Sequence, residues 1–340
     1  MSNDGRISRR MWMVGAASVA GGMALAACHA ESRTQGRFGF TISPPTPGLS
    51  EFRRDVRAVS DLGVAWVRFG VVANDVVASW FEDNRVRFDD AACETYRQAF
   101  DIVEAEGLRV NLLTVDGVAG VPDEEVYLRL MGQYWSGVAK RFGTRVDIWQ
   151  VFNEANDLDF RSASPIRGSI DEYHAALDRA IGRARASIHQ FSPSVAVTTN
   201  AGGYPVNDAT ERNWQRFFAA VGGSLDIVTV DIYPVLSEAA NATLPARFER
   251  LRELTGKPLA VGEFGLQTGE QLYSEAEQVA SLTTTITELA ETCASPIFVY
   301  RLRDDGAEND DGFGLFEQNG QAKSSFAPVA RVISEKFPEG

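Results

Sequence analysis

Residues 147–157 read Asp-Ile-Trp-Gln-Val-Phe-Asn-Glu-Ala-Asn-Asp, and this stretch decides the fold. Its first half is rich in large apolar residues, which is typical of a parallel strand that is covered on both faces. The apolar run ends abruptly at Asn153 and Glu154, so a carboxylate stands at the carboxyl end of the strand. In a barrel of parallel strands these ends face one shared crevice, where catalytic residues lie. Glu154 is therefore the first candidate site residue.

From Arg37 onward the chain repeats one unit, in which a short apolar run precedes a polar loop and a segment with helical spacing. Eight such units fit into residues 37–340, which predicts a single (β/α)8 TIM barrel of the α/β class. The alternative is a doubly wound open sheet, but the Gly-rich phosphate turn that often follows its first strand is absent. Besides the stretch above, the predicted strands are 38–43, 64–69, 108–115, 195–200, 225–233, 258–264 and 296–302.

A second carboxylate, Glu263, ends the apolar run that starts at Leu259. Glutamate is depleted in strands, because burying a charge without a partner is unfavourable. One such residue would indicate a solvated strand end or an ion pair, but two at equivalent strand ends favour a functional site. Cleavage of a glycosidic bond requires two carboxylates, since one protonates the departing oxygen while the other attacks the anomeric carbon or activates water.

At Asn153-Glu154 and Glu263 the sequence resembles glycoside hydrolase clan A, the retaining glycosidases with a barrel fold. The resemblance covers essentially all of the chain after residue 27. It implies that Glu154 is the general acid and then base, that Glu263 is the nucleophile, and that Asn153 contacts the 2-hydroxyl of the sugar. It also implies catalysis without a metal or an organic cofactor.

The chain departs from the commonest pattern of the clan at three places. Many members have Pro, His and Trp where this sequence has Ala155, Asp231 and Tyr300. The segment 301–323 looks more like family 39 and family 5-like bacterial enzymes, some of which trim exopolysaccharide during its secretion.

Two residues are expected to support the nucleophile. A nucleophilic carboxylate must stay ionised, so cations and hydrogen-bond donors should surround it. Arg68 ends the second strand and Tyr233 ends the sixth, and both match clan residues that contact the nucleophile. The alternatives are a surface ion pair for Arg68 and a packing role for Tyr233. Asp116 and Asn200, which follow strands three and five, are candidate contacts for sugar hydroxyls.

Sugar rings have apolar faces, so aromatic side chains are expected around the carboxylates. The predicted loops 71–88, 157–169 and 303–323 are long, and long loops at the active end of a barrel shape the cleft. The aromatic candidates at strand ends and on loops are Tyr300, Trp80, Tyr204 and Phe313. Trp66 and Trp149 lie within strands and are interpreted as barrel filling.

The N-terminal residues predict export. Arg9 and Arg10 precede a small apolar run, 14–27, which suggests a twin-arginine signal and is too short to span a bilayer comfortably. The run ends at Leu-Ala-Ala-Cys28, which resembles a bacterial lipobox, so residues 1–27 are expected to be removed and Cys28 to be lipidated. Residues 28–36 would then be a tether, and the product a periplasmic or outer-membrane lipoprotein. The alternative is ordinary cleavage without a lipid.

The formal net charge is −13, and removal of the leader's three arginines and one aspartate makes it −15. This charge excludes a nucleic-acid partner, which requires a basic surface, and leaves Cys28 as the expected membrane attachment. The histidines have no metal-ligand spacing. Cys93 and Cys293 fall in separate predicted helices, so both are expected to be packing residues without a disulfide.

A carbohydrate is therefore the expected partner. Two alternatives to hydrolysis stay open at this point. A carbohydrate-binding lipoprotein could retain the barrel without catalysis, although it has no need for a matched acid and nucleophile. Transglycosylation, in which a second sugar replaces water, would use the same residues.

Overall fold

The computed structural model describes most of the chain after the predicted leader. The lipidation candidate Cys28 and the candidate sugar contact Asp116 lie outside the described residues. The described residues are 36–46, 48–82, 85–115, 117–118, 120–157, 165–166, 168–205, 207–233, 243–270, 272–306 and 312–337.

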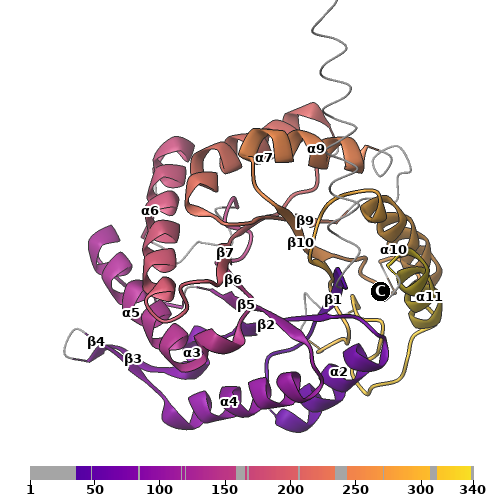
Figure 1. The fold of residues 1–340 in the computed structure, drawn as a ribbon, viewed down its shortest axis with the longest axis horizontal. Coiled ribbons are helices and arrows are strands. Elements are labelled where there is room, and N and C mark those ends of the chain that lie inside the picture. The colour runs from indigo at the N-terminus through magenta and orange to yellow at the C-terminus, as the bar shows by residue number, and fades with distance from the viewer. Residues whose placement is uncertain are drawn as a thin grey trace, which may run out of the picture.

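The central feature is a closed barrel of parallel strands (Figure 1). Hydrogen-bonded neighbours follow the order β7-β6-β5-β2-β1-β11-β10-β9-β8. Only Thr199 separates β7 from β8, so these are two pieces of one strand and the order closes on itself. The predicted (β/α)8 TIM barrel is confirmed, and the open sheet is excluded. The strands are β1 Phe38–Thr41, β2 Trp66–Val71, β5 Arg109–Thr114, β6 Ile148–Val151, β7 Ala196–Thr198, β8 Asn200–Ala201, β9 Val228–Ile232, β10 Leu259–Phe264 and β11 Ile297–Val299.

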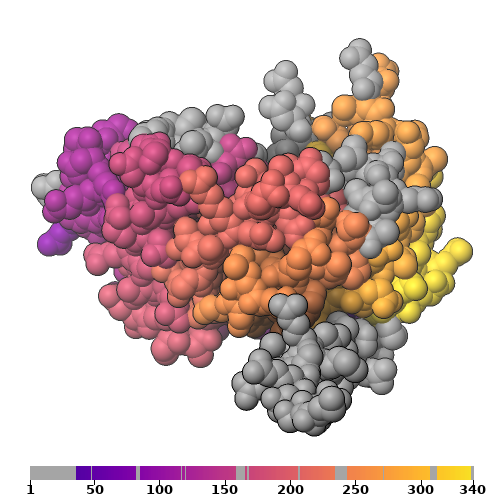
Figure 2. All heavy atoms as spheres, turned by 90° about the horizontal axis from the view of Figure 1, so that it is seen from above, coloured from indigo at the N-terminus to yellow at the C-terminus, as the bar shows by residue number. Residues whose placement is uncertain are grey.

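Helices form a ring around the barrel (Figure 1). They are α2 Leu49–Asp61, α4 Asp90–Ala105, α5 Glu124–Phe142, α6 Ile170–His189, α7 Asp208–Val221, α9 Leu244–Thr255, α10 Glu275–Ala290 and α11 Phe326–Lys336. Several begin at a capping side chain, such as Asp123 before α5 and Ser169, which forms a capping box with Glu172 at α6. Figure 2 shows α6, α7 and α9 side by side as one continuous wall. No helix in the described part of the chain is both long and apolar enough to cross a membrane.

The barrel interior is filled by large side chains. Trp66 is buried inside the barrel, as expected, whereas Trp149 is buried in the cluster between the strands and the helices, so the interpretation of barrel filling is wrong for Trp149. Side chains alternate along a strand, and the neighbours Ile148 and Gln150 face the interior. Trp66 packs with Ile148 and Phe298 in a layer near the starts of the strands, where its ring meets that of Phe298 edge to face. The polar residues of the next layers therefore lie towards the carboxyl ends.

The predicted loop 71–88 contains secondary structure of its own. It forms the short helix α3 Ala73–Val76 and the antiparallel hairpin of β3 Val77–Glu82 and β4 Arg85–Phe88, which projects from the barrel in Figure 1. The alternation of apolar and polar residues in 85–88 is the period of a strand and explains the hairpin. The ring of Trp80 packs against Tyr134 of α5 with centroids 5.6 Å apart, so its described contact is one of packing.

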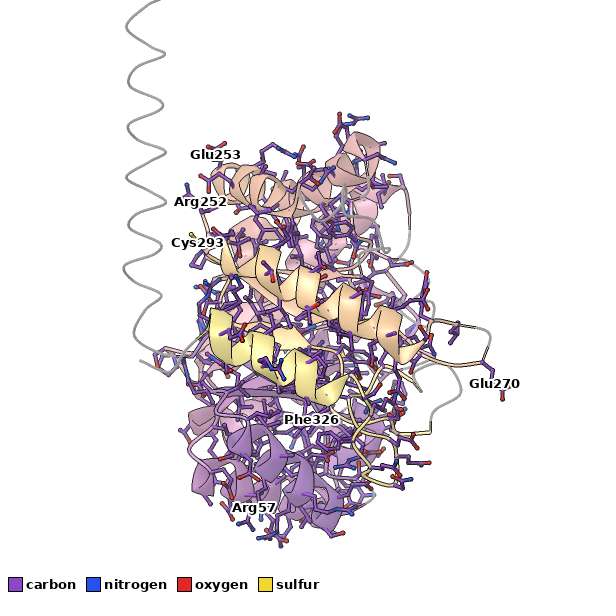
Figure 3. The ribbon with its side chains drawn as sticks, turned by 90° about the vertical axis from the view of Figure 1, so that its right-hand side faces the viewer. Arg57, Arg252, Glu253, Glu270, Cys293 and Phe326 are labelled. Atoms are coloured by element: carbon purple, nitrogen blue, oxygen red, sulfur yellow. The ribbon has the colours of Figure 1, made fainter. Side chains whose placement is uncertain are left out.

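The cysteines only partly follow the expectation. Cys93 is buried and free, whereas Cys293 is disulfide-bonded, so the prediction of a packing thiol is wrong for Cys293. Figure 3 shows Cys293 at the same end of the molecule as Arg252 and Glu253, whereas Glu270 projects from the opposite end.

Candidate active site

Glu154 stands on a strained stretch of backbone directly after β6. Phe152 and Glu154 have φ values of 67° and 41°, in the left-handed region that costs a residue other than glycine about 1–3 kcal/mol. Tertiary contacts hold this conformation, because Phe152 N donates to Thr114 O at 2.9 Å and Glu154 N donates to Asn200 Oδ1 at 2.7 Å. Strain that neighbouring elements maintain around a carboxylate is typical of functional sites.

Glu263 lies in β10 with two strong partners. Its Oε1 forms an ion pair with Arg68 Nη1 at 2.8 Å, and its Oε2 accepts a hydrogen bond from the Tyr233 hydroxyl at 2.5 Å. Glu263 is 6% exposed and Arg68 is 1% exposed, so the pair is shielded from water. Burial and the charge of Glu263 raise the pKa of Tyr233 well above its usual value, which keeps the phenol a donor. The structure thus surrounds Glu263 with a cation and a donor.

Arg68 links β2 to the strand that carries Glu154. Its Nε donates to Gln150 Oε1 at 2.9 Å, and its Nη2 donates to Asn153 Oδ1 at 3.2 Å. Burial acts to lower the pKa of Arg68, but the charge of Glu263 and the ion pair with it raise that pKa above its usual value. The guanidinium is therefore a permanent cation at the centre of the site.

Glu154 is in a different electrostatic environment. Burial and the charge of Glu263, with a smaller effect of Asp157, raise the pKa of Glu154 to about 7, although Arg68 acts to lower it. Near neutral pH this carboxyl group is close to half protonated, so it can both donate and accept a proton. The two glutamates are thus distinguished by their partners.

Asn200 and Asn153 connect the two carboxylates. Asn200 lies in β8, and its Nδ2 donates to Asn153 Oδ1 at 3.1 Å and to Asp231 Oδ2. Asn153 Oδ1 also accepts from Gln150 Nε2 at 3.4 Å. All of these side chains come from the carboxyl halves of neighbouring strands.

Three aromatic rings lie beside Glu263. Tyr233, Tyr300 and Phe313 meet edge to face, with centroid distances of 6.4 Å between the tyrosines and 5.8 and 5.4 Å to Phe313. Each ring is half-buried. Of the other predicted aromatics, Tyr204 is buried, and Trp80 of the hairpin packs against Tyr134 of α5.

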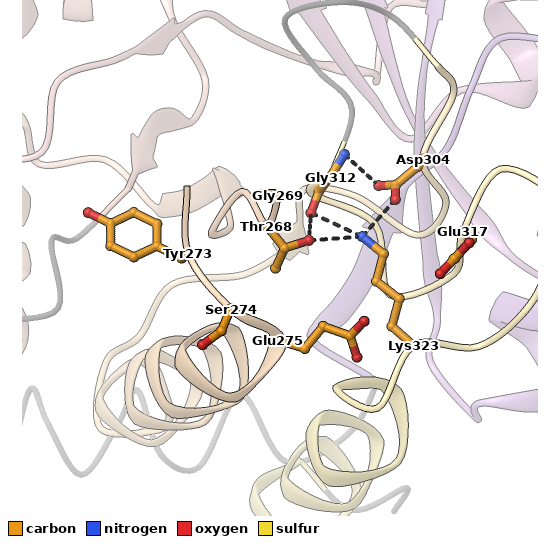
Figure 4. A pocket seen from close by; sticks show the side chains of 9 residues that line it. All are labelled: Thr268, Gly269, Tyr273, Ser274, Glu275, Asp304, Gly312, Glu317 and Lys323. Carbon is orange, nitrogen blue, oxygen red and sulfur yellow. Dashed lines mark hydrogen bonds and ion pairs between the residues drawn. The ribbon is translucent and has the colours of Figure 1, made fainter. Parts of the chain in front are cut away.

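The loop that carries Phe313 is held by a buried ion pair. Asp304 Oδ1 accepts hydrogen bonds from Gly312 N at 3.0 Å and from Gly314 N at 2.6 Å. These two residues precede and follow Phe313. Asp304 Oδ2 pairs with Lys323 Nζ at 2.6 Å, and Lys323 also donates to Gly312 O at 3.1 Å (Figure 4). Asp304, Gly312 and Lys323 line a polar hollow of about 400 Å³. Phe313 is therefore a fixed part of the aromatic group.

Sequence reasoning missed two polar residues of the site. Gln150 holds Arg68 and Asn153, and Asp231 holds Asn200. Both are fully buried within strands. A polar residue inside an otherwise apolar strand is the signal that could have found them. No group of three or more His, Cys, Asp or Glu residues in the described ranges is arranged to hold a metal ion.

Comparison with known proteins gives matches in structure. No protein-family model matches the chain, and no curated protein sequence matches it. Its structure is similar to that of the beta-glycosidase BGL167, with a TM-score of 0.69 and 16% identity over 90% of this chain and 97% of that one. It is also similar to the exo-beta-1,4-mannosidase Op5Man5 from Opitutaceae bacterium strain TAV5, with a TM-score of 0.69 and 16% identity over 89% of this chain and 60% of that one.

A third similar structure is a family 1 b-glucosidase from Thermotoga maritima, with a TM-score of 0.66 and 14% identity over 88% of this chain and 98% of that one. At these identities the likeness shows a shared fold. The three proteins bear the names of glycosidases, and they share the barrel that the resemblance to clan A implies.

Proposed function

We propose that this protein is a retaining glycoside hydrolase that cleaves a poly- or oligosaccharide by double displacement. The observation that carries the proposal is the contrast between the two glutamates. Glu263 is ion-paired with Arg68, whereas the pKa of Glu154 is raised to about 7 by burial and by the charge of Glu263. This is the division of roles that a nucleophile and an acid/base require.

In the first step a Glu263 oxygen attacks the anomeric carbon, and the bond from that carbon to the departing oxygen breaks. Glu154 gives its proton to the departing oxygen, so the leaving group departs as an alcohol and Glu154 becomes a carboxylate. Arg68 and the Tyr233 hydroxyl remain on Glu263 while its charge is lost to the ester.

In the second step Glu154 takes a proton from water, and the water oxygen attacks the anomeric carbon. The bond to Glu263 breaks, which restores the carboxylate and its ion pair with Arg68. The configuration at the anomeric carbon is retained, because it is inverted twice. Asn153 Oδ1 is occupied by donors, so its Nδ2 is the atom offered to a sugar hydroxyl.

The aromatic group supports a carbohydrate substrate. Tyr233, Tyr300 and Phe313 place half-buried rings next to the nucleophile, where the apolar face of a sugar can pack. The names of the similar structures favour a β-linked glycoside as the first substrate to test. Export directed by residues 8–28 is also part of the proposal and is supported by their sequence.

The test uses purified protein and a panel of aryl β-glucosides and β-mannosides. Glu263→Gln and Glu154→Gln should each lose nearly all turnover, while Glu270→Gln, on an exposed rim residue, should keep it. The first-formed sugar, observed by proton NMR, should keep the β configuration. Binding of sugar without turnover by the parent protein would identify a carbohydrate-binding lipoprotein instead, and products longer than the substrate would identify a transglycosylase.

A further inference from the structure

Asp231 is a buried carboxyl group that the proposed reaction does not use. It lies in β9 with 0% exposure. Its Oδ2 accepts from Asn200 Nδ2, but its Oδ1 has no hydrogen-bond partner among the described residues. The backbone of Gly262 in β10 covers that oxygen so closely that a Cβ there would lie 2.6 Å from it. An ionised carboxylate in this position would carry its charge without the hydrogen bonds that it needs.

The orientation of Asn200 fixes which Asp231 oxygen can carry a proton. Asn200 Oδ1 accepts from the backbone N–H of Glu154 at 2.7 Å, so Asn200 Nδ2 must face the other way, towards Asp231 and Asn153. Because Nδ2 is a donor, Asp231 Oδ2 must be an acceptor. A proton on Asp231 can therefore stand only on Oδ1.

The charges around Asp231 also favour a proton there. Three carboxyl groups, from Glu154, Glu263 and Asp231, share the site, and Arg68 contacts that of Glu263. Buried charges must be paired, and one cation balances one carboxylate. Arg68 is paired with Glu263, and Asp231 has no ion pair among the described residues, so a proton on Asp231 is what removes its buried charge.

We propose that Asp231 is held as a neutral carboxylic acid with its proton on Oδ1, and that it is the positioning residue that orients Asn200 and, through Asn200, the backbone of Glu154. The kinetic part of this inference rests on the proposed glycosidase function. The protonation state of Asp231 does not.

The groups that face Asp231 agree with this assignment. Burial raises the pKa of Asp231 well above its usual value, and the charges of Glu263 on β10 and Glu154 after β6 raise it further. Arg68 on β2 and the hydrogen bond from Asn200 on β8 act in the opposite direction and are weaker than burial.

The first test measures stability and needs no substrate. The melting temperature of Asp231→Asn is compared with that of the parent between pH 5 and pH 8. Above the usual pKa of aspartate, about 3.9, the unfolded parent releases the Asp231 proton while the folded parent keeps it, so parent stability falls as pH rises. Asparagine has no proton to release, so the melting temperature of Asp231→Asn should rise relative to that of the parent with each unit of pH. Asp61→Asn is the control for the loss of one carboxylate, because Asp61 is exposed at the end of α2.

A difference in melting temperature that does not change with pH would overturn the neutral carboxyl group. This outcome is independent of whether the protein cleaves sugars, so it separates a failure of the inference from a failure of the proposed function.

The second test measures the positioning role. Asparagine keeps an acceptor for Asn200 Nδ2, so kcat of Asp231→Asn should stay within about threefold of the parent, whereas Asp231→Ala should lose about tenfold or more. The loss in Asp231→Ala should be larger for poor leaving groups, because they depend most on proton donation by Glu154. Equal losses in both variants would mean that the negative charge is required, and parental activity in Asp231→Ala would mean that Asp231 positions nothing. If Asp231→Ala does not fold, Asp231→Asn alone decides. A folded Asp231→Asn whose kcat is more than about tenfold below that of the parent overturns the inference.

Discussion

Gly202 is predicted to set the position of the proton donor. A Cβ added there would lie 2.1 Å from Glu154 Oε1, whereas ordinary contact begins at 3.4 Å, so the carboxyl group would have to retreat by more than 1 Å. The backbone of Gly202 cannot yield instead, because its N–H donates to Asn156 Oδ1 at 2.8 Å and its carbonyl accepts from Trp214 Nε1 at 2.8 Å. A misplacement of this size costs about 10²-fold in rate, or about 2.7 kcal/mol of activation free energy.

The assay compares kcat/KM of Gly202→Ala with the parent on aryl glycosides whose phenols differ in acidity. Acidic phenols depart without a proton, so the loss should be small for them and should approach 10²-fold for the least acidic phenols. Gly223→Ala is the matched control, since nothing lies within 4 Å of a Cβ at that position. An equal loss for all leaving groups, or none at all, would refute the assigned position and role of Glu154.

Three further predictions follow from the environments of the site residues. The pKa of Glu154 is raised to about 7, so its acid form is present mainly below that pH. The value of kcat/KM should therefore fall about tenfold for each pH unit above 7, and a flat profile from pH 6 to pH 9 would contradict the acid role. Arg68→Met leaves Glu263 buried without its cation, so the free energy of unfolding measured by urea denaturation should fall by about 3–5 kcal/mol. A fall of less than about 1 kcal/mol would show that the ion pair is not shielded from water. Tyr233→Phe removes the hydroxyl that donates to Glu263 and should lower kcat by about tenfold or more with the melting temperature kept within a few degrees; unchanged kcat would remove Tyr233 from the site.

The barrel and its two glutamates could be predicted because both depend on local sequence. Apolar runs alternate with helical spacing along the chain, and Glu154 and Glu263 each end such a run at a place where a charge is unfavourable without a partner. The barrel fold then brings the strand ends together without further information. The same reasoning singled out Arg68 and Tyr233, and the structure joins both to Glu263. Tyr233 does follow the end of β9, but the prediction that Arg68 ends its strand is wrong, because β2 continues to Val71.

The remainder depends on tertiary contacts that no short stretch of sequence reveals. The left-handed backbone at Phe152 and Glu154 exists because Thr114 and Asn200 hold it, and both lie on other strands. The hairpin in residues 77–88 was predicted as a loop, because its two strands pair with each other outside the repeating units of the barrel. Asp231 was noted only as a departure from a family pattern, since its importance lies in its contact with Asn200 and in the charges that other strands bring close to it.

Trapping the glycosyl-enzyme tests the central claim most directly. A 2-deoxy-2-fluoro glycoside with a good leaving group slows the second step, so the sugar should accumulate on the nucleophile and the intact protein should gain the mass of one fluorosugar. Digestion and tandem mass spectrometry should place that mass on Glu263, the carboxylate that Arg68 and Tyr233 hold. An adduct on another residue, or a parent enzyme that turns over substrate with inverted configuration and never carries a sugar, would contradict the double displacement at Glu263.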